Sequence, residues 1–275
     1  MRRIKNKKFK RTNPLIYFEK VLWSQGIEYV AGVDEVGLGA LAGPVVACAV
    51  IFPKDIDFFK VKDSKKLTIK QRESLYRQIK DKALCIGIGE VSIEEINRIN
   101  NIYRCGLEAM RKAVYSLKIE PQHILVDARE IPDLELPQSS FKNGEDINFS
   151  IAAASIVAKV YRDDLMKKYA AVYPEYRFEE HKGYATSFHI RMLKEIGPSK
   201  IHRTSYDFIK GICGGFSKIY FEFNEKIKKA SSEDDITLLY NKLEQLKKRI
   251  SPLERTRLRA KITSRRRSME LRLAK

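Results

Sequence analysis

The stretch YVAGVDEVGLGALAGPVVACAV, residues 29–50, decides the expected fold. It opens with an apolar, β-branched run, which predicts a buried strand. A second apolar run, from Val45 to Phe52, predicts the return strand of a hairpin. Two acids, Asp34 and Glu35, stand between these runs and are followed by Gly37 and Gly39.

The two acids of this stretch are adjacent and lie within apolar flanks. An unpaired buried carboxylate is costly, so such a group shifts its pKa, pairs with a cation or binds a metal. Neighbouring strand residues point to opposite faces, so both acids serve one site only if the backbone bends directly after them. Gly37 and Gly39 allow that bend and bring backbone N–H groups close to a ligand. The alternative is an ordinary hairpin with two solvated acids at its turn.

The composition indicates a globular intracellular protein. The chain has 275 residues, of which 44% are hydrophobic, enough for one core with or without a small appendage. No run approaches the roughly 18 apolar residues of a membrane span. The N-terminus is basic but has no apolar segment after it, so it does not predict a secretion signal. Cysteines 48, 85, 105 and 213 show no metal-ligand spacing, and we expect reduced cysteines in a cytoplasmic protein.

The net charge of +18 is unevenly placed. Cationic residues crowd into the first eleven positions and the last thirty or so. A field of this sign attracts polyanions, which favours nucleic acid as a partner. A lysine-rich surface that serves only solubility is the alternative.

The rest of the chain alternates between helical and strand patterns, which predicts an α/β sheet with sites at its strand ends. Asp127 closes a short apolar run and is therefore a third candidate acid for the site. Residues 132–148 are expected to form a loop. The predicted helices cover 14–25, 68–79, 101–117, 151–171 and 186–196, and the further strands cover 83–91 and 123–127.

The helix over 151–171 carries a polar stripe on an otherwise apolar surface. Ser155, Lys159, Arg162 and Asp163 follow at helical spacing and share one face. This polar stripe either faces a functional site or marks where the helix becomes exposed to solvent. In the second case Arg162 and Asp163 are solvated.

Eight motifs follow one another along the chain: Gly32–Gly37, Leu41–Pro44, Asp63–Leu67, Val126–Asp127, Ile151–Ile156, Ala158–Asp163, His181–Tyr184 and Ile201–Arg203. In this order they resemble bacterial ribonuclease HII, the type 2 ribonuclease H family, over residues 29–208. The resemblance implies a ribonuclease H-like mixed sheet flanked by helices. It also implies an endonuclease that cuts the RNA strand of RNA–DNA hybrids and incises 5′ to single ribonucleotides in duplex DNA, leaving 5′-phosphate and 3′-hydroxyl ends. A non-catalytic nucleic-acid-binding protein on the same fold is the alternative.

The resemblance also assigns site residues. Its four metal-binding carboxylates fall on Asp34, Glu35, Asp127 and Asp163, which implies two divalent ions, Mg²⁺ or Mn²⁺. Its substrate contacts fall on Gly37, Leu38, Gly39, Ser64, Lys65, Lys66 and Tyr184. In two places the chain departs from the family pattern. Leu38 stands where the family has an arginine between two glycines, and Asn143-Gly144-Glu145 stands where it usually has Lys-Gly-Asp. The sister family, ribonuclease HIII, fits less well, because its fourth acid is usually glutamate.

We expect three parts along the chain: a basic arm over 1–13, a catalytic domain over 14–213 and a basic helical extension over 214–275. Two helices, 236–250 and 253–273, are expected in the extension. The last of them is expected to lie along nucleic acid, and a partner-binding or frayed terminus is the alternative. The protein is expected to act as a monomer on RNA–DNA hybrids and ribonucleotide-containing duplex DNA, and the sequence does not identify a protein partner.

Overall fold

The structure is a computed structural model that describes residues 14–56, 67–206, 209 and 217–273. The predicted basic arm, Ser64, Lys65 and Lys66 lie outside the described residues, as does the predicted boundary between 213 and 214. The chain forms two compact units, Met1–Tyr184 and Ala185–Lys275. This division falls earlier than the predicted one and within the stretch that resembles the ribonuclease family.

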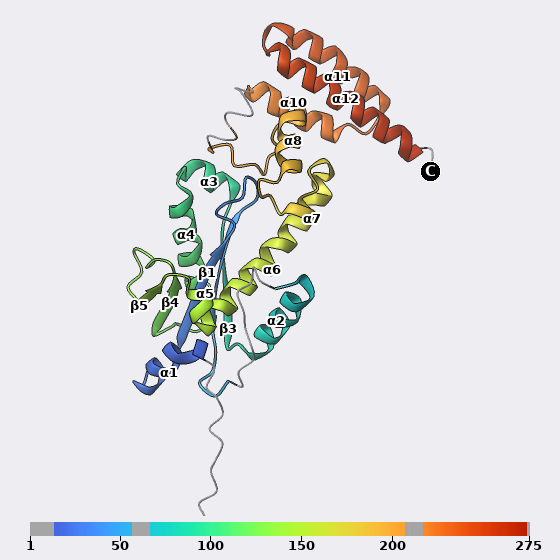
Figure 1. Ribbon diagram of the computed structural model, residues 1–275. Coiled ribbons are helices and arrows are strands. Elements are labelled where there is room, and N and C mark those ends of the chain that lie inside the picture. The colour runs from blue at the N-terminus through green and yellow to red at the C-terminus, as the bar shows by residue number, and fades with distance from the viewer. Residues whose placement is uncertain (1–13, 57–66, 207–208, 210–216, 274–275) are drawn as a thin grey trace, which may run out of the picture. The chain divides into compact units, whose positions relative to one another are not determined.

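The first unit is built on one mixed, five-stranded sheet with the order β3-β2-β1-β4-β5 (Figure 1). The predicted hairpin is confirmed, because β1 pairs with β2 antiparallel and β2 pairs with β3 antiparallel. The other two strands run parallel to β1 and to each other. The strands are β1 (Val30–Val36), β2 (Val45–Ile51), β3 (Cys85–Val91), β4 (His123–Asp127) and β5 (Gln138–Phe141).

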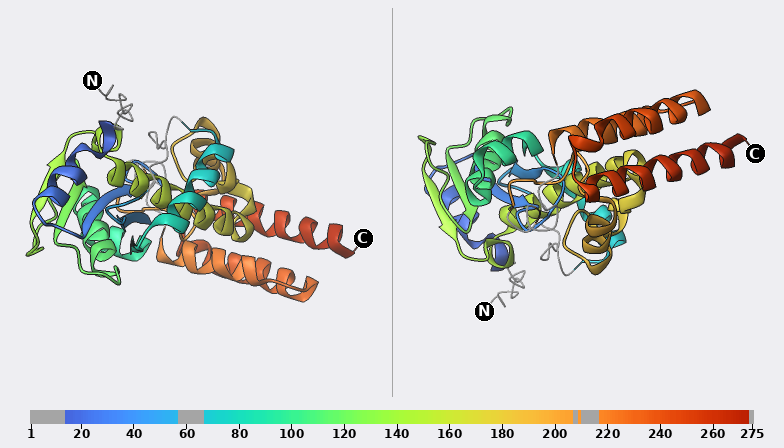
Figure 2. Two further views of the ribbon diagram at one scale, coloured as in Figure 1. Left: turned by 90° about the horizontal axis from the view of Figure 1, so that it is seen from below. Right: turned by 90° about the horizontal axis from the view of Figure 1, so that it is seen from above.

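Helices cover both faces of the sheet (Figures 1 and 2). The long helix α6 (Phe149–Val172) packs on β1 and β2, whereas α4 (Ile102–Tyr115) packs on β2 and β3 from the other face. α2 (Ile69–Lys82) lies against α6. A glycine permits the closest approach of α6, because a Cβ on Gly32 would lie 2.2 Å from the backbone carbon of Ser150. The strand that carries Asp34 is thereby held directly against the helix.

The helix starts agree with the sequence signals. Thr68 and Gln71 form a capping box at α2, and Ser92 and Glu95 form another at α3 (Ile93–Ile99). The N-terminal helix is a short 3-10 turn, Pro14–Ile16, followed by α1 (Tyr17–Ser24). Short helical turns also cover Pro174–Tyr176 and α7 (Phe178–His181).

The expected loop over 132–148 is wrong in part, because it holds β5 and the four-residue helix α5 (Gly144–Ile147). β5 pairs with β4 alone and its residues are half-buried or exposed. An edge strand this short needs no apolar alternation, so the sequence pattern does not reveal it.

The second unit is helical. Its helices are α8 (Ser187–Ile196), α10 (Lys218–Lys229), α11 (Glu233–Gln245) and α12 (Pro252–Leu273), with a 3-10 turn at Leu246–Lys248. The last three share an apolar core that includes Tyr220, Phe223, Leu239 and Leu258. The helical extension is thus present, although α10 was not predicted. No helix in the described ranges has the length and apolar character needed to cross a membrane.

Candidate active site

Three carboxylates meet where β1 and β4 end. Asp34, Glu35 and Asp127 each offer an oxygen, and these oxygens all lie within 4.8 Å of one another. The parallel pairing of Val33 with Val126 explains the meeting, because it places Asp34 and Asp127 side by side on adjacent strands. Glu35 joins them from the next position of β1.

Backbone amides fix two of these carboxylates. Asp34 Oδ1 accepts a hydrogen bond from the Glu35 amide at 2.8 Å, and Asp127 Oδ1 accepts one from the Gly144 amide at 2.6 Å. A Cβ on Gly144 would lie 3.3 Å from Asp127 Oδ1 and 2.7 Å from Ile151 Cδ1, so a larger residue would crowd this contact.

The electrostatics of the cluster favour a cation. Asp34 is 4% exposed, and burial raises its pKa well above the usual value. The negative charges of Glu35 and Asp127 raise the pKa further, and that of Glu145 adds to them, whereas a hydrogen bond from Ser155 opposes the shift. A divalent ion relieves both the burial and the repulsion of such a set. Oxygen donors alone suit the hard ions Mg²⁺ and Mn²⁺ better than zinc, so the residues fit the implied metal.

Glu145 is a fourth acid of this site that the sequence interpretation missed. It lies on α5, close enough to act on the charge of Asp34, and its Oε2 accepts a hydrogen bond from Ser155 Oγ at 2.9 Å. A signal was present, since Asn143-Gly144-Glu145 replaces the Lys-Gly-Asp of the family. Asn143 has the left-handed backbone, φ 56°, that turns the chain into α5.

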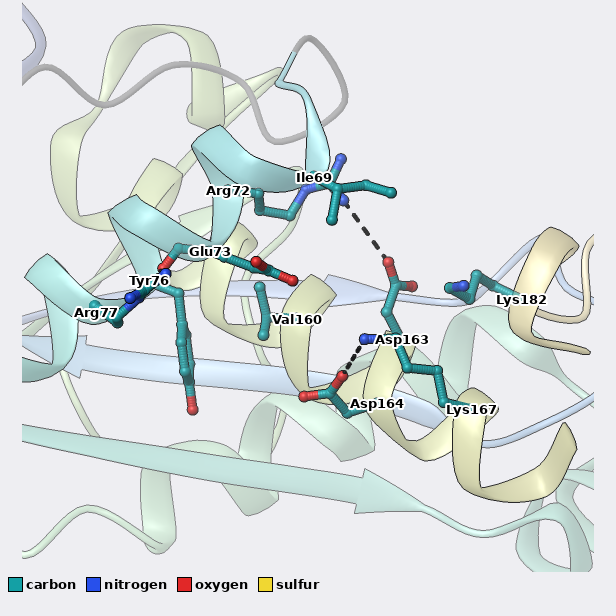
Figure 3. Close-up of a pocket in the computed structure, with 10 residues that line it drawn as sticks. All are labelled: Ile69, Arg72, Glu73, Tyr76, Arg77, Val160, Asp163, Asp164, Lys167 and Lys182. Atoms are coloured by element: carbon teal, nitrogen blue, oxygen red, sulfur yellow. Dashed lines mark hydrogen bonds and ion pairs between the residues drawn. The ribbon is translucent and has the colours of Figure 1, made fainter. Parts of the chain in front are cut away.

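Asp163, the predicted fourth ligand, is not brought to the other three acids. It lies on α6 eight residues beyond Ser155, about 12 Å farther along the helix axis at 1.5 Å per residue. Its carboxylate pairs with Lys159 Nζ at 2.7 Å and with Arg72 Nη1 at 3.7 Å. Figure 3 shows the second pair across a pocket between α2 and α6. The carboxylate is thus held by cations within the protein.

The predicted substrate turn and tyrosine do come together. A Cβ on Gly39 would lie 4.0 Å from Tyr184 Cε1, and Gly37 has the positive φ, 98°, that the turn requires. The amide of Leu41 donates to the Gly183 carbonyl at 2.8 Å, which ties the two loops. Leu38 turns instead towards α4.

The contact made by Leu38 is with Gly106 of α4. A Cβ on Gly106 would lie 3.0 Å from Leu38 Cδ2, so this side chain rests against the helix backbone. Leu38 therefore anchors the turn by apolar packing, which an arginine side chain would not provide in the same way.

Arg162 is a second residue whose position the sequence did not reveal. It is 0% exposed, so the alternative in which Arg162 is solvated is wrong. Its guanidinium donates to the carbonyls of Pro44, Lys182 and Ala42, each at 3.0 Å, and lies 5.4 Å from the centre of the Tyr184 ring. One buried cation thus fastens the loop after Gly39 to the loop that carries Tyr184.

Known proteins are similar to this chain in sequence and in fold. The family profile described as Ribonuclease HII matches residues 31–209, which span the division between the two units. A ribonuclease HII of Ligilactobacillus salivarius is 48% identical over 212 residues, covering 77% of this chain and 82% of the relative. One of Caldanaerobacter subterraneus is 46% identical over 200 residues, covering 73% and 83%.

Among solved structures, the ribonuclease H2 of Pyrococcus horikoshii aligns with a TM-score of 0.57 and 28% identity, covering 68% of this chain and 97% of that one. The profile covers more than half of the chain, and the relatives match about three quarters of it at nearly half identity. The chain belongs to the ribonuclease HII family.

Proposed function

We propose that this protein is an endonuclease that hydrolyses the RNA strand of RNA–DNA hybrids and incises 5′ to single ribonucleotides in duplex DNA. Family membership supports the first, coarser activity. The observation that carries the proposal is the meeting of Asp34, Glu35 and Asp127 at the ends of two parallel strands. A protein that only binds nucleic acid has no use for three mutually repulsive carboxylates within 4.8 Å of one another, one of them buried.

The metal ligands in this proposal are Asp34, Glu35, Asp127 and Glu145. When bound, two divalent ions activate the attacking water and stabilise the leaving oxygen of an in-line displacement. The protein's own contribution is to hold the carboxylates ready. The Gly144 amide orients Asp127, and Ser155 orients Glu145. Asp163 was predicted as a ligand, but its carboxylate forms ion pairs with Lys159 and Arg72.

On the substrate side, we propose that backbone groups of Gly37 and Gly39 contact the ribonucleotide and that Tyr184 packs beside it. The proximity of Gly39 to the tyrosine ring supports this assignment. The Leu38 side chain rests on α4, so it does not replace the contact of the family arginine. Phosphate binding by Ser64, Lys65 and Lys66 stays a prediction.

Strand-cleavage mapping tests the proposal. The substrates are a duplex with one ribonucleotide and a long RNA–DNA hybrid, each with Mg²⁺, with Mn²⁺ and with a chelator. We expect metal-dependent cleavage of both, which Asp34→Asn abolishes while leaving duplex binding nearly intact. Calorimetric titration of Mn²⁺ provides a readout independent of turnover, and we expect the same variant to bind the ion more weakly. Undiminished cleavage by Asp34→Asn would reject the site, and binding without cleavage by the native protein would favour the non-catalytic alternative.

Three further expectations belong to this proposal. The buried, free cysteines 48, 85 and 105 are consistent with a reducing compartment such as the cytoplasm. Action as a monomer stays a prediction. So does a functional boundary near 213, since the family match ends at residue 209.

A further inference from the structure

The positive charge of this protein lies at the two ends of its chain. Residues 1–13 hold seven Lys and Arg and no acid, and residues 217–275 hold seventeen Lys and Arg against eight acids. The remaining residues, 14–216, hold 29 basic and 27 acidic side chains. A nearly neutral central part has little long-range attraction for a polyanion, so the ends supply it. Of the two ends, the structure describes the second.

Most cations of the last helix hold the second unit together. Arg265 donates to the Ala230 carbonyl at 3.0 and 2.8 Å, and Lys261 donates to Asn224 Oδ1 at 2.8 Å. Arg257 reaches the Lys194 carbonyl. Arg259 and Arg266 pair with Glu244 and Glu233. These contacts therefore argue against the expectation that α12 lies along nucleic acid over its whole length.

A different group of cations points outward. Lys247, Lys248 and Arg249 are consecutive and exposed in the turn between α11 and α12, and we call them the basic turn. Within the described part of the chain none of the three forms an ion pair. Leu243 and Ile250 are buried on either side of the turn, so it is anchored to the core of the unit.

The nearby acids do not neutralise the basic turn. Glu244, three residues before Lys247, is the nearest acid, and its carboxylate pairs with Arg259 of α12. Glu233, Asp234 and Asp235 stand at the opposite end of α11, about 18 Å away at 1.5 Å per residue. That distance exceeds the Debye length of about 8 Å at physiological salt. Glu254 is buried, and its carboxylate accepts hydrogen bonds from the amides of Ser217 and Ser251. The three cations therefore face solvent as an uncompensated group.

We propose that the basic turn binds the phosphate backbone of duplex nucleic acid, outside the catalytic site and without sequence preference. Phosphate contacts need only positioned cations, which the turn offers. A protein partner or a membrane would require an apolar centre as well. Leu238 is the one exposed large hydrophobic residue identified in the described part of the second unit, and it lies on α11. The contact would add affinity that the nearly neutral central part lacks.

The test measures binding of the full-length protein to a DNA duplex without any ribonucleotide, in chelator, by fluorescence anisotropy between about 50 and 200 mM salt. The variant carries Lys247→Gln, Lys248→Gln and Arg249→Gln. Each neutralised phosphate contact contributes about 0.9 to the slope of log affinity against log salt, so we expect the slope to fall by about 2.7. The melting temperature is measured in parallel and is expected to stay unchanged, because all three side chains are exposed.

A matched control distinguishes the effect of where the three cations lie from the effect of lowering the net charge. Lys54→Gln, Lys118→Gln and Lys168→Gln remove three exposed cations from the first unit, and we expect a much smaller change of slope. An unchanged slope in the basic-turn variant, or an equal loss in the control, would overturn the proposal. So would binding of poly-glutamate as tight as binding of the duplex. A failure to cleave any substrate would refute the proposed function but would leave this slope unaffected.

Discussion

Ser155 Oγ lies 2.9 Å from Glu145 Oε2, and this hydrogen bond joins the first turns of α6 to the carboxylate site. The same serine helps to stabilise the charged form of Asp34. The single hydroxyl hydrogen of Ser155 can therefore be donated to either of two acids that come from different elements. The N-terminal part of α6, which carries Ser155, therefore belongs to the site. Asp163 lies two turns farther along the helix.

Neutralising Glu145 and Asp163 in separate variants shows which of them is the fourth metal ligand. We expect Glu145→Gln to lower single-turnover cleavage on the order of 100-fold and to weaken Mn²⁺ binding, because it removes a charge from the cluster. Asp163→Asn leaves the cluster intact and should reduce cleavage less than about tenfold. Cleavage rates across a Mg²⁺ titration measure both. The reverse order of effects would restore Asp163 as the ligand.

Neutralising Asp34 should have opposite effects on stability without and with metal. Three carboxylates within 4.8 Å repel one another, so Asp34→Asn should raise the melting temperature in chelator. Addition of Mn²⁺ should stabilise the native protein and have little effect on the variant. Thermal unfolding followed by circular dichroism checks both signs. A variant that is less stable in chelator would mean that the carboxylates are not mutually repulsive.

Removing Arg162 should destabilise the protein and impair substrate binding. Arg162→Met leaves three buried carbonyls without their donor, which should cost about 3 kcal/mol of unfolding free energy. The KM for cleavage should rise because Tyr184 loses its support, and Arg162→Lys should recover part of both losses. The control is Arg77→Met, an exposed position where we expect less than about 0.5 kcal/mol. Urea unfolding and steady-state cleavage provide the measurements.

Glu19 should make stability depend on pH. It is 1% exposed, and burial raises its pKa above the usual value, although hydrogen bonds from Ser150 act in the other direction. The folded protein therefore keeps a proton that the unfolded chain has already released. Its contribution to stability is fully present below the unfolded pKa and is lost as pH rises through the folded pKa.

Glu19→Gln stays neutral and can still accept both hydrogen bonds from Ser150 at its amide oxygen. The stability of the variant relative to the native protein should therefore increase with pH between about 4 and 8. Urea unfolding at several pH values measures this difference. Glu28→Gln, at an exposed position, should show no such trend. A constant difference for Glu19→Gln would show that the carboxyl does not titrate in this range.

The sequence predicted the features that depend on local pattern. The hairpin and the capped helices carry their own signals in apolar periodicity and in the pairs Thr68–Gln71 and Ser92–Glu95. Three of the acids stand at ends of predicted strands, where sites gather. The place of Glu145 in the site was not predicted, because it depends on where α6 begins relative to the sheet and on a four-residue helix without periodicity. Whether Arg162 is solvated stayed open at the level of sequence, because its carbonyl partners are distant along the chain.

The register between β1 and β4 limits where this chain can gain or lose residues during evolution. Val33 lies opposite Val126, and the next residue on each strand is an acid. One residue inserted between 123 and 127 would turn Asp127 to the other face of the sheet and separate it from Asp34. Length variation among natural homologues should therefore be tolerated in the connection over 128–137 and selected against inside either strand.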